Sequence, residues 1–194
     1  MPRPRGRPRS FDTDEALARA TERFRTGGLA GTSLDELSDA TGLARPSLAA
    51  AFGDKRALYI AAIDRLSARV EAQLVRLGTL GLSYPALAER LLTGGVDLYL
   101  TGTDRPEGCL IINTAATAAA ADPEVRTRLT TFLAMEDARI TALLAAAGSP
   151  TPEAHGRLVA SVLHSLSVRA RAGEPREALV TIAKDVAALL CTKA

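Results

Sequence analysis

The amino-acid sequence predicts an all-α fold. Hydrophobic residues make up 47% of the 194 residues, but only 4% are aromatic and Trp is absent. Ala, Leu, Arg and Glu recur throughout the chain, and these residue types favour helices. A strand would need Val, Ile, Thr and aromatic residues with period two, and the nearest candidate, residues 110–112, leads directly into Ala-rich sequence. The length suits one domain, or a small domain joined to a larger one, with its own core.

Three short helices are predicted within the first part of the chain. The first starts at Asp12, a capping residue, and stops at Gly27, the first of two glycines. Ser33 caps the second helix. Gly42 makes a turn, and the third helix covers residues 44–52.

A long helix is predicted to follow. Gly53 ends the third helix and Asp54 caps the fourth, whose apolar residues recur at helical spacing as far as Leu77. At 3.6 residues per turn this rod has about six turns. A connector of this length suggests that two domains share one helix, and we expect them to span residues 11–53 and 54–194.

Five further helices complete a predicted total of about nine. The fifth starts near Tyr84 and has a weak point at Gly94-Gly95, and the sixth covers residues 109–120. Each of the last three has a proline in its first turn, where the missing N–H costs nothing. These prolines are Pro123, Pro152 and Pro175.

Positive charge is concentrated at the start of the chain. The formal net charge is +2, but four arginines in residues 1–10 contribute +4, so the remainder carries −2. Interspersed prolines prevent a helix there. We expect residues 1–10 to form a disordered basic arm that lies along a phosphate backbone; the alternative is a solvated leader with no binding role.

Several classes of protein and site are not expected. Cys109 and Cys191 form no CxxC pair, and no cluster of Cys, His and carboxylates is evident, so we expect neither a metal nor a cofactor. The chain has no HExxH, GxSxG or Walker-type motif, which argues against an enzyme. No apolar stretch is long enough to span a bilayer and no signal peptide is evident. We expect a cytoplasmic protein without a membrane partner.

Residues 32–52 have the spacing of a helix-turn-helix. Ser38 is small where the two helices would cross, Gly42 accepts positive φ at the turn, and Leu48 anchors the second helix. The outer face of that helix is then free to enter a DNA major groove. A helical hairpin with a Gly turn and no DNA partner would have the same spacing.

The sequence around this motif resembles the N-terminal signature of the Tet repressor (TetR/AcrR) family. The resemblance is detailed from the basic leader to Leu58. In the remainder of the chain it is limited to the helix pattern and to residues 108–113 and 122–125. The matching segments are Thr32-Ser33-Leu34, Ala40-Thr41-Gly42-Leu43, Ser47-Leu48 and Phe52-Gly53-Asp54-Lys55. The resemblance implies a transcriptional repressor that binds palindromic double-stranded operator DNA as a homodimer and is released by a small-molecule effector.

The resemblance also implies which residues contact DNA. Residues 44–52 become the recognition helix, with Arg45 bonded either to guanine O6 and N7 or to a phosphate. Lys55 matches a lysine that meets a phosphate, and Thr32 and Ser33 offer hydroxyl and N–H groups to another. The implied DNA-binding residues are Arg3, Arg5, Arg7, Arg9, Thr32, Ser33, Ala44, Arg45, Ser47, Ala49, Ala50 and Lys55.

Two residues of the recognition helix depart from the family pattern. Ala49 stands where the family usually has Tyr, and Ala51 where it has a polar or aromatic residue. Either Ala49 and Ala50 pack against thymine methyl groups, or the protein binds DNA more weakly and relies on the basic arm. The operator is therefore not predictable from the family.

The two C-terminal helices are predicted to form the dimer interface. One helix-turn-helix buries too little surface for tight, specific DNA binding, so dimers are the common solution. The apolar stripes of these helices are wide enough for two neighbours, and the resemblance implies a four-helix interface; the alternative places both stripes in a monomer's core. The predicted interface residues are Leu158, Val162, Leu166, Leu179, Ile182, Val186 and Leu189.

The fourth to seventh predicted helices are expected to enclose an apolar effector pocket with a few polar groups. The candidate residues, each with core filling or surface exposure as its alternative role, are Tyr99, Cys109, Asn113, Phe132 and Met135. Cys109 lies near a helix N-terminus, where the dipole lowers a thiol pKa. Two alternative functions follow: an electrophile or oxidant sensor acting through Cys109, and a small-molecule-binding helical protein with weakened DNA binding.

Overall fold

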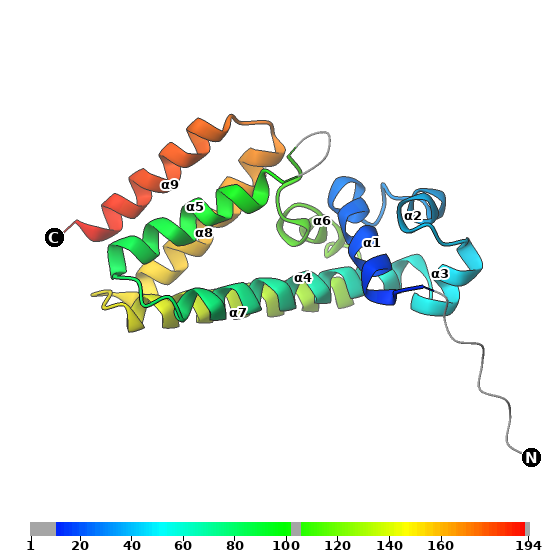
Figure 1. The fold of residues 1–194 in the computed structure, drawn as a ribbon, viewed down its shortest axis with the longest axis horizontal. Helices are drawn as coiled ribbons and strands as arrows, with labels where there is room; N and C mark the ends of the chain where they lie inside the picture. Colours follow the sequence, from blue (N-terminus) through cyan, green and yellow to red (C-terminus); the bar gives the residue numbers. More distant parts are fainter. Residues whose placement is uncertain (1–10, 102–105, 193–194) are drawn as a thin grey trace, which may run out of the picture.

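The computed structural model describes residues 11–101 and 106–192, and within them it contains helices and no strand. The predicted all-α fold is confirmed. Three helices lie at one end of an elongated molecule, a group of longer helices lies at the other, and the long helix α4 runs between the two ends (Figure 1). The predicted contacts of the arm residues Arg3, Arg5, Arg7 and Arg9 lie outside the described residues.

The first three helices form a small group stabilised by caps and a tight turn. Ser33 and Glu36 form a reciprocal capping box at the start of the second helix. Gly42 ends that helix in a left-handed conformation with φ 70°, which a residue with a side chain adopts only with strain. The three helices are α1 (Thr13–Gly27), α2 (Leu34–Thr41) and α3 (Arg45–Phe52).

Helix α4 (Lys55–Gly78) belongs to both ends of the molecule. It has 24 residues and a length of about 36 Å at 1.5 Å per residue. Asp54 caps it by accepting a hydrogen bond from the backbone N–H of Ala57. Tyr59 packs edge-on against Phe24 of α1, with 5.0 Å between ring centroids, and both side chains are fully buried. The first turns of α4 are thereby fixed to α1.

The later helices pack on α4 mainly through α7, which lies along α4 from Arg56 to Glu71. Helix α7 contacts α4, while α5 contacts both α8 and α9 (Figure 1). No helix in the described parts of the chain is both long and apolar enough to cross a membrane. These elements are α5 (Tyr84–Tyr99), a π-helical turn (Ile111–Ala115), α6 (Ala116–Ala118), α7 (Pro123–Ala146), α8 (Pro152–Arg171) and α9 (Arg176–Cys191).

The structure differs from the predicted elements in two places. Helix α5 itself runs through Gly94 and Gly95 as predicted, and the missing side chain of Gly95 leaves room for a methyl group of Leu163 of α8, to which a Cβ would be 2.4 Å away. The predicted helix over 109–120 is present over residues 110–118, but residues 111–115 of it form a π-helical turn. Pro175 is the cap of α9 and not part of its first turn.

Candidate nucleic-acid interface and ligand cavity

Within the described residues, helix α3 packs against the protein through the face that carries Leu48. Leu48 is 3% exposed and packs in the core, where Leu37 of α2 is also buried. The residues on the opposite face are small, apart from Arg45 and Pro46. The exposed residues of α3 and its cap are Ala44, Arg45, Pro46, Ala49 and Ala50, while Ser47 is half-buried. The exposed side of α3 therefore consists mainly of small side chains together with Arg45 and Pro46.

Arg45 is the only cationic side chain within α3. Its Nε donates a hydrogen bond to Asp35 Oδ1 of α2 at 2.8 Å, and both side chains are mostly exposed. This contact raises the pKa of Arg45 further, so the guanidinium stays charged. An exposed ion pair contributes little free energy, so Arg45 can exchange Asp35 for an outside acceptor at small cost.

The predicted phosphate contacts around α2 are not all accessible. The Thr32 hydroxyl is buried and has no hydrogen-bond partner within the described residues, and Lys55 Nζ donates to the Thr32 carbonyl at 2.9 Å. The Ser33 hydroxyl accepts from the Glu36 N–H, and the Ser33 N–H donates to the Glu36 carboxylate, a bond that helps to lower the pKa of that carboxyl to about 2. Of the groups that the sequence assigned to DNA, the Thr32 hydroxyl is therefore buried, while Ser33 and Lys55 are bonded within the protein.

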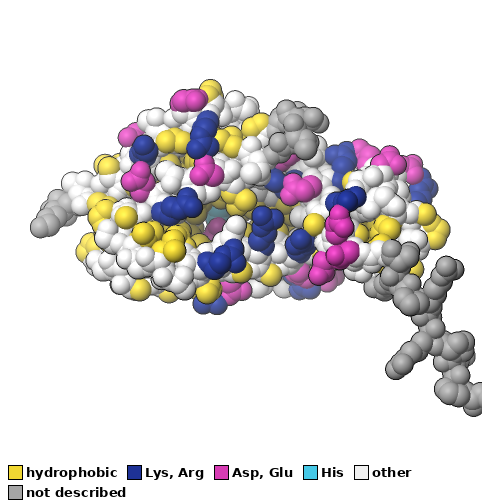
Figure 2. Space-filling model, viewed as in Figure 1, with side chains coloured by type: hydrophobic (Ala, Val, Ile, Leu, Met, Phe, Trp, Pro, Cys, Tyr) yellow, Lys and Arg dark blue, Asp and Glu magenta, His cyan; other side chains and the backbone are white. Residues whose placement is uncertain are grey.

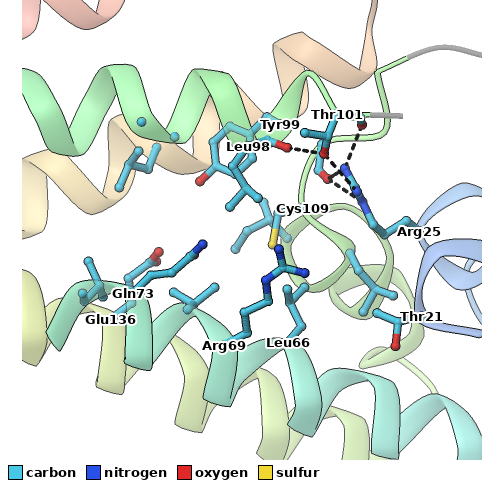
Figure 3. A pocket seen from close by; sticks show the side chains of 18 of the residues that line it. Thr21, Arg25, Leu66, Arg69, Gln73, Leu98, Tyr99, Thr101, Cys109 and Glu136 are labelled. Carbon is cyan, nitrogen blue, oxygen red and sulfur yellow. Dashed lines mark hydrogen bonds between the residues drawn. The ribbon is translucent and has the colours of Figure 1, made fainter. Parts of the chain in front are cut away.

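A large cavity lies between α1, α4, α5 and the segment that precedes the π-helical turn. Its volume is about 1020 Å³, at the upper end of the range for small-molecule sites. Tyr99, Cys109 and Phe132 line it, as predicted. Figure 3 shows Tyr99 and Cys109 beside the cavity, with Arg69 and Gln73 projecting into it from α4.

Two predicted pocket residues do not line the cavity. Asn113 Nδ2 donates to Ser167 Oγ at 3.0 Å and to the Glu107 carbonyl at 3.3 Å, so this amide holds the π-helical turn against α8. Met135 is half-buried and packs against the hydrophobic core. The helical spacing used for the prediction could not distinguish the cavity face from the neighbouring core face.

Cys109 is buried, with 8% of its surface exposed. Burial raises the pKa of this thiol to about 11, although the backbone N–H groups of Ile111 and Ile112 act in the opposite direction. The sequence predicted a lowered pKa from the helix dipole alone. Loss of hydration outweighs the dipole here, so the thiol is protonated at neutral pH, which does not favour a role as an electrophile sensor.

The cavity contains charged residues that the sequence analysis missed. Glu136 of α7 is 5% exposed, and its Oε2 lies 2.6 Å from His164 Nε2 of α8. Arg65, Arg69 and Gln73 share one face of α4, since they are spaced four residues apart. In the sequence, these polar residues recur every four positions beside an apolar stripe. This repeat was the signal that could have identified them as cavity residues.

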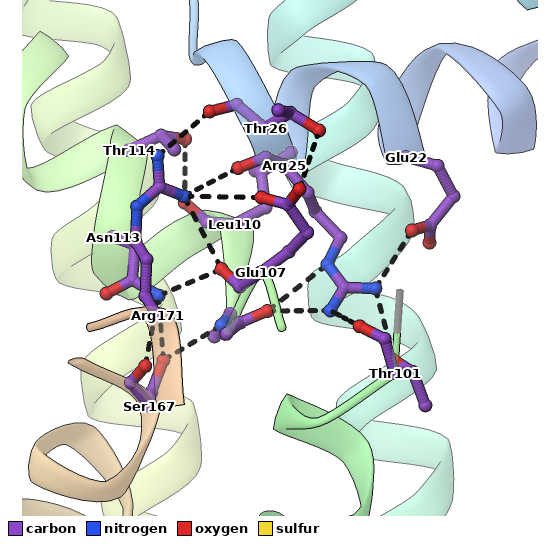
Figure 4. Close-up of polar contacts among 12 residues, drawn as sticks. Glu22, Arg25, Thr26, Thr101, Glu107, Leu110, Asn113, Thr114, Ser167 and Arg171 are labelled. Atoms are coloured by element: carbon purple, nitrogen blue, oxygen red, sulfur yellow. Dashed lines mark hydrogen bonds and ion pairs between the residues drawn. The ribbon is translucent and has the colours of Figure 1, made fainter. Parts of the chain in front are cut away.

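A polar junction connects α1 to the rim of the cavity (Figure 4). Arg25 of α1 is 7% exposed, and its Nη2 donates to the carbonyls of Gly108 at 2.9 Å and Thr101 at 3.1 Å. From α8, Arg171 donates to the carbonyls of Arg25 at 2.7 Å and Thr26 at 2.9 Å. Residues that are far apart in the sequence thus join the first three helices to the segment that carries Cys109.

A second connection lies near the start of α4. Arg56 Nε donates to Asp122 Oδ2 at 2.6 Å, and Arg56 Nη2 donates to Glu124 Oε2 at 2.8 Å. The guanidinium lowers the pKa of Asp122 to about 2. The sequence analysis did not predict this contact between Asp122 and α4.

The predicted dimer residues fall into three groups. Leu166 and Leu179 are fully buried within the protomer, so assigning them to the interface was wrong: their side chains pack in the protomer's own core. Leu158 of α8 and Leu189 of α9 are 47% and 73% exposed, and the remaining three are half-buried. The half-buried residues are Val162, Ile182 and Val186.

Comparisons with known proteins cover nearly all of this chain. Residues 16–62 match the family described as bacterial regulatory proteins, tetR family. The chain is 33% identical over 190 residues to the HTH-type transcriptional repressor ComR of Escherichia coli (strain K12), covering 92% of this chain and 89% of ComR.

Solved structures agree with this similarity. The fold is similar to that of the TetR family regulator CifR, solved as a cysteine mutant with 26 bp of double-strand operator DNA, with a TM-score of 0.82 and 28% identity over 94% of this chain and 98% of that one. A TetR family regulator from Cytophaga hutchinsonii has a TM-score of 0.77 and 19% identity over 93% of this chain and 96% of that one, and so agrees in fold alone. The similarity therefore includes the first three helices and the elements around the cavity.

Proposed function

Because this chain belongs to the tetR family of bacterial regulatory proteins, we propose that it is a transcriptional repressor that binds double-stranded operator DNA through α3. The observation that carries the proposal is the position of helix α3, which is anchored by buried Leu48 while Arg45, Ala49 and Ala50 are exposed. A helix held in this way can lie in a major groove. The operator complex of CifR and the repressor activity named for ComR support the proposal. Family membership also identifies the chain as a regulator and not an enzyme, as the sequence predicted.

The basic arm and the outer face of α3 have different roles in this proposal. The arginines of residues 1–10 would neutralise phosphates, and Arg45 would leave Asp35 for a base edge or a phosphate. Ala49 and Ala50 would approach thymine methyl groups. The division into an arm, a DNA-binding domain (11–53) and an effector-binding and dimerisation domain (54–194) remains part of the proposal.

Operator binding is tested with DNA from upstream of the protein's own gene in a fluorescence polarisation assay. We expect tight binding whose affinity falls by about two orders of magnitude or more between 50 and 200 mM salt, because bound phosphates release counterions. Scrambled DNA of the same length is the control and should bind much more weakly. Equal affinity for both DNAs across the salt series would contradict specific operator recognition.

We further propose that two copies associate through α8 and α9, in line with the exposed Leu158 and Leu189. The double variant Leu158→Glu with Leu189→Glu is expected to sediment as a monomer at micromolar concentration, because charges do not tolerate burial without partners. Val75→Glu is the matched control, since Val75 is 51% exposed on α4. Sedimentation velocity measures the outcome, and a wild-type monomer or a dimeric double variant would contradict this interface.

A cytoplasmic small-molecule effector would act from the cavity. Arg25 lines the cavity and also fixes α1 to Gly108, so a ligand that shifts the segment around Gly108 would move the first three helices. An effector changes operator affinity only through different affinities for two conformations. An inducer that occupies the cavity without changing operator affinity would refute this part of the proposal.

A further inference from the structure

Four arginines beside the cavity have no hydrogen-bond or ion-pair partner within the described residues. They all line the cavity, three from α4 and one from α5. Every other arginine that lines it forms an ion pair: Arg19 with Glu15, and Arg25 with Glu22. The four without partners are Arg65, Arg69, Arg76 and Arg90.

The carboxylates of the cavity, in contrast, all have partners. Glu22 pairs with Arg25, and Glu107 accepts a hydrogen bond from Thr26 Oγ1 at 3.0 Å and lies 3.8 Å from Arg171. Glu136 is bonded to His164. The carboxylates are therefore occupied, and the excess charge that faces an incoming ligand is positive.

The positions of the arginines place this charge along the mouth of the cavity. Arg69, Arg76 and Arg90 are exposed and Arg65 is half-buried. Figure 2 shows Lys and Arg side chains gathered along a hollow between α4 and α5, and Figure 3 shows Arg69 reaching from α4 toward Cys109. Arg90 comes from the opposite side, with its Nη1 close to Gly94 of the lining.

Much of the remaining lining is apolar and comes from several helices. These side chains can bury a hydrocarbon chain or ring system but offer few polar contacts for it. The residues are Leu66 and Val70 of α4, Leu91 and Leu98 of α5, Phe132 of α7 and Leu163 of α8. The cavity thus combines an apolar interior with a cationic mouth.

We propose that this cavity binds an amphipathic anion, with its apolar body among these leucines and Phe132 and its carboxylate or phosphate head at the arginines of α4 and α5. The proposal rests on the proposed function, because it names the chemical class of the effector. Repulsion between arginines four residues apart disfavours the helix, and a bound anion relieves it. Guanidinium groups also bind carboxylates and phosphates through two parallel hydrogen bonds. A neutral or cationic ligand would neither relieve this repulsion nor accept these paired hydrogen bonds.

The test compares three probes that share one apolar chain and differ in head group: dodecanoate, dodecanol and dodecyltrimethylammonium. Each is titrated below its micelle-forming concentration into the full-length protein without DNA, and binding is measured by isothermal titration calorimetry. We expect dodecanoate to bind about tenfold or more tightly than dodecanol, and the cation to bind most weakly. Dodecyl phosphate distinguishes the two anionic head groups. If it binds more tightly than dodecanoate, the natural ligand is assigned a phosphate ester as its head group, and if it binds more weakly, a carboxylate.

Variants show whether the arginines cause the preference. The double variant Arg65→Gln with Arg69→Gln should bind dodecanoate about tenfold more weakly while its affinity for dodecanol changes less than about twofold. Arg157→Gln is the control, because Arg157 is exposed on α8 and does not line the cavity. Equal binding of dodecanoate and dodecanol, preference for the cation, or an unchanged double variant would overturn the proposal. Salt-dependent operator binding, measured separately, would stand in any of these cases, so the two proposals fail independently.

Discussion

Replacing Ala49 with Glu is expected to lower operator affinity by at least about 100-fold. Ala49 is exposed on α3, about 100° around the helix axis from buried Leu48. A carboxylate at this position would enter the groove among phosphates and base edges, where it is repelled and loses its hydration. Glu is also a good helix former, so the fold of α3 should be kept. Fluorescence polarisation with the operator fragment measures the effect.

A matched change elsewhere separates the local effect from the added charge. Ala142 is exposed on α7, and Ala142→Glu adds the same side chain to a helix far along the chain from α3. We expect this control to bind the operator within about threefold of the wild type, since long-range repulsion is screened by salt. If Ala49→Glu instead binds like the control, another surface contacts the DNA and the proposed role of α3 is wrong.

Replacing Arg25 with Met is expected to lower the free energy of unfolding by about 2–4 kcal/mol, because removing one partner of a buried charged hydrogen bond leaves the other unsatisfied. Arg25 is 7% exposed, and its guanidinium is bonded to the carbonyls of Gly108 and Thr101. Met keeps much of the apolar stem but provides no donor. Urea unfolding followed by circular dichroism measures the change.

Arg19 provides the comparison for Arg25 on the same helix. Its ion pair with Glu15 is exposed on both sides, and exposed pairs of this kind contribute little. Arg19→Met should therefore lower the free energy of unfolding by less than about 0.5 kcal/mol. Equal losses in the two variants would mean that the bonds to Gly108 and Thr101 do not stabilise the junction between α1 and the cavity.

The first three helices could be predicted closely from the sequence because their signals are local. Asp12, Ser33 and Asp54 cap the helices that follow them, and Gly42 adopts the left-handed conformation that its turn requires. Each of these effects involves residues within about one turn of one another. The long α4 was predictable for the same reason, since the Asp54 cap and the apolar spacing as far as Leu77 indicate where it starts and ends.

The contents of the cavity could be predicted only in part. The local dipole indicated a lowered pKa for Cys109, whereas burial among other helices raises it. Asn113 was expected in the pocket but bonds to Ser167, 54 residues later. Helical spacing indicates that a residue faces inward, but it does not indicate whether the space beyond holds another side chain or a cavity.

The sequence by itself therefore determined the helices, their caps and the helix-turn-helix, because neighbours along the chain control backbone conformation. Only the tertiary structure decided which charges have partners. Arg25 meets Gly108 across 83 positions of the chain, and Glu136 meets His164 while Arg69 is left facing the cavity without a partner within the described residues. Desolvation and ion pairing depend on distances in space, which the packing of distant helices sets.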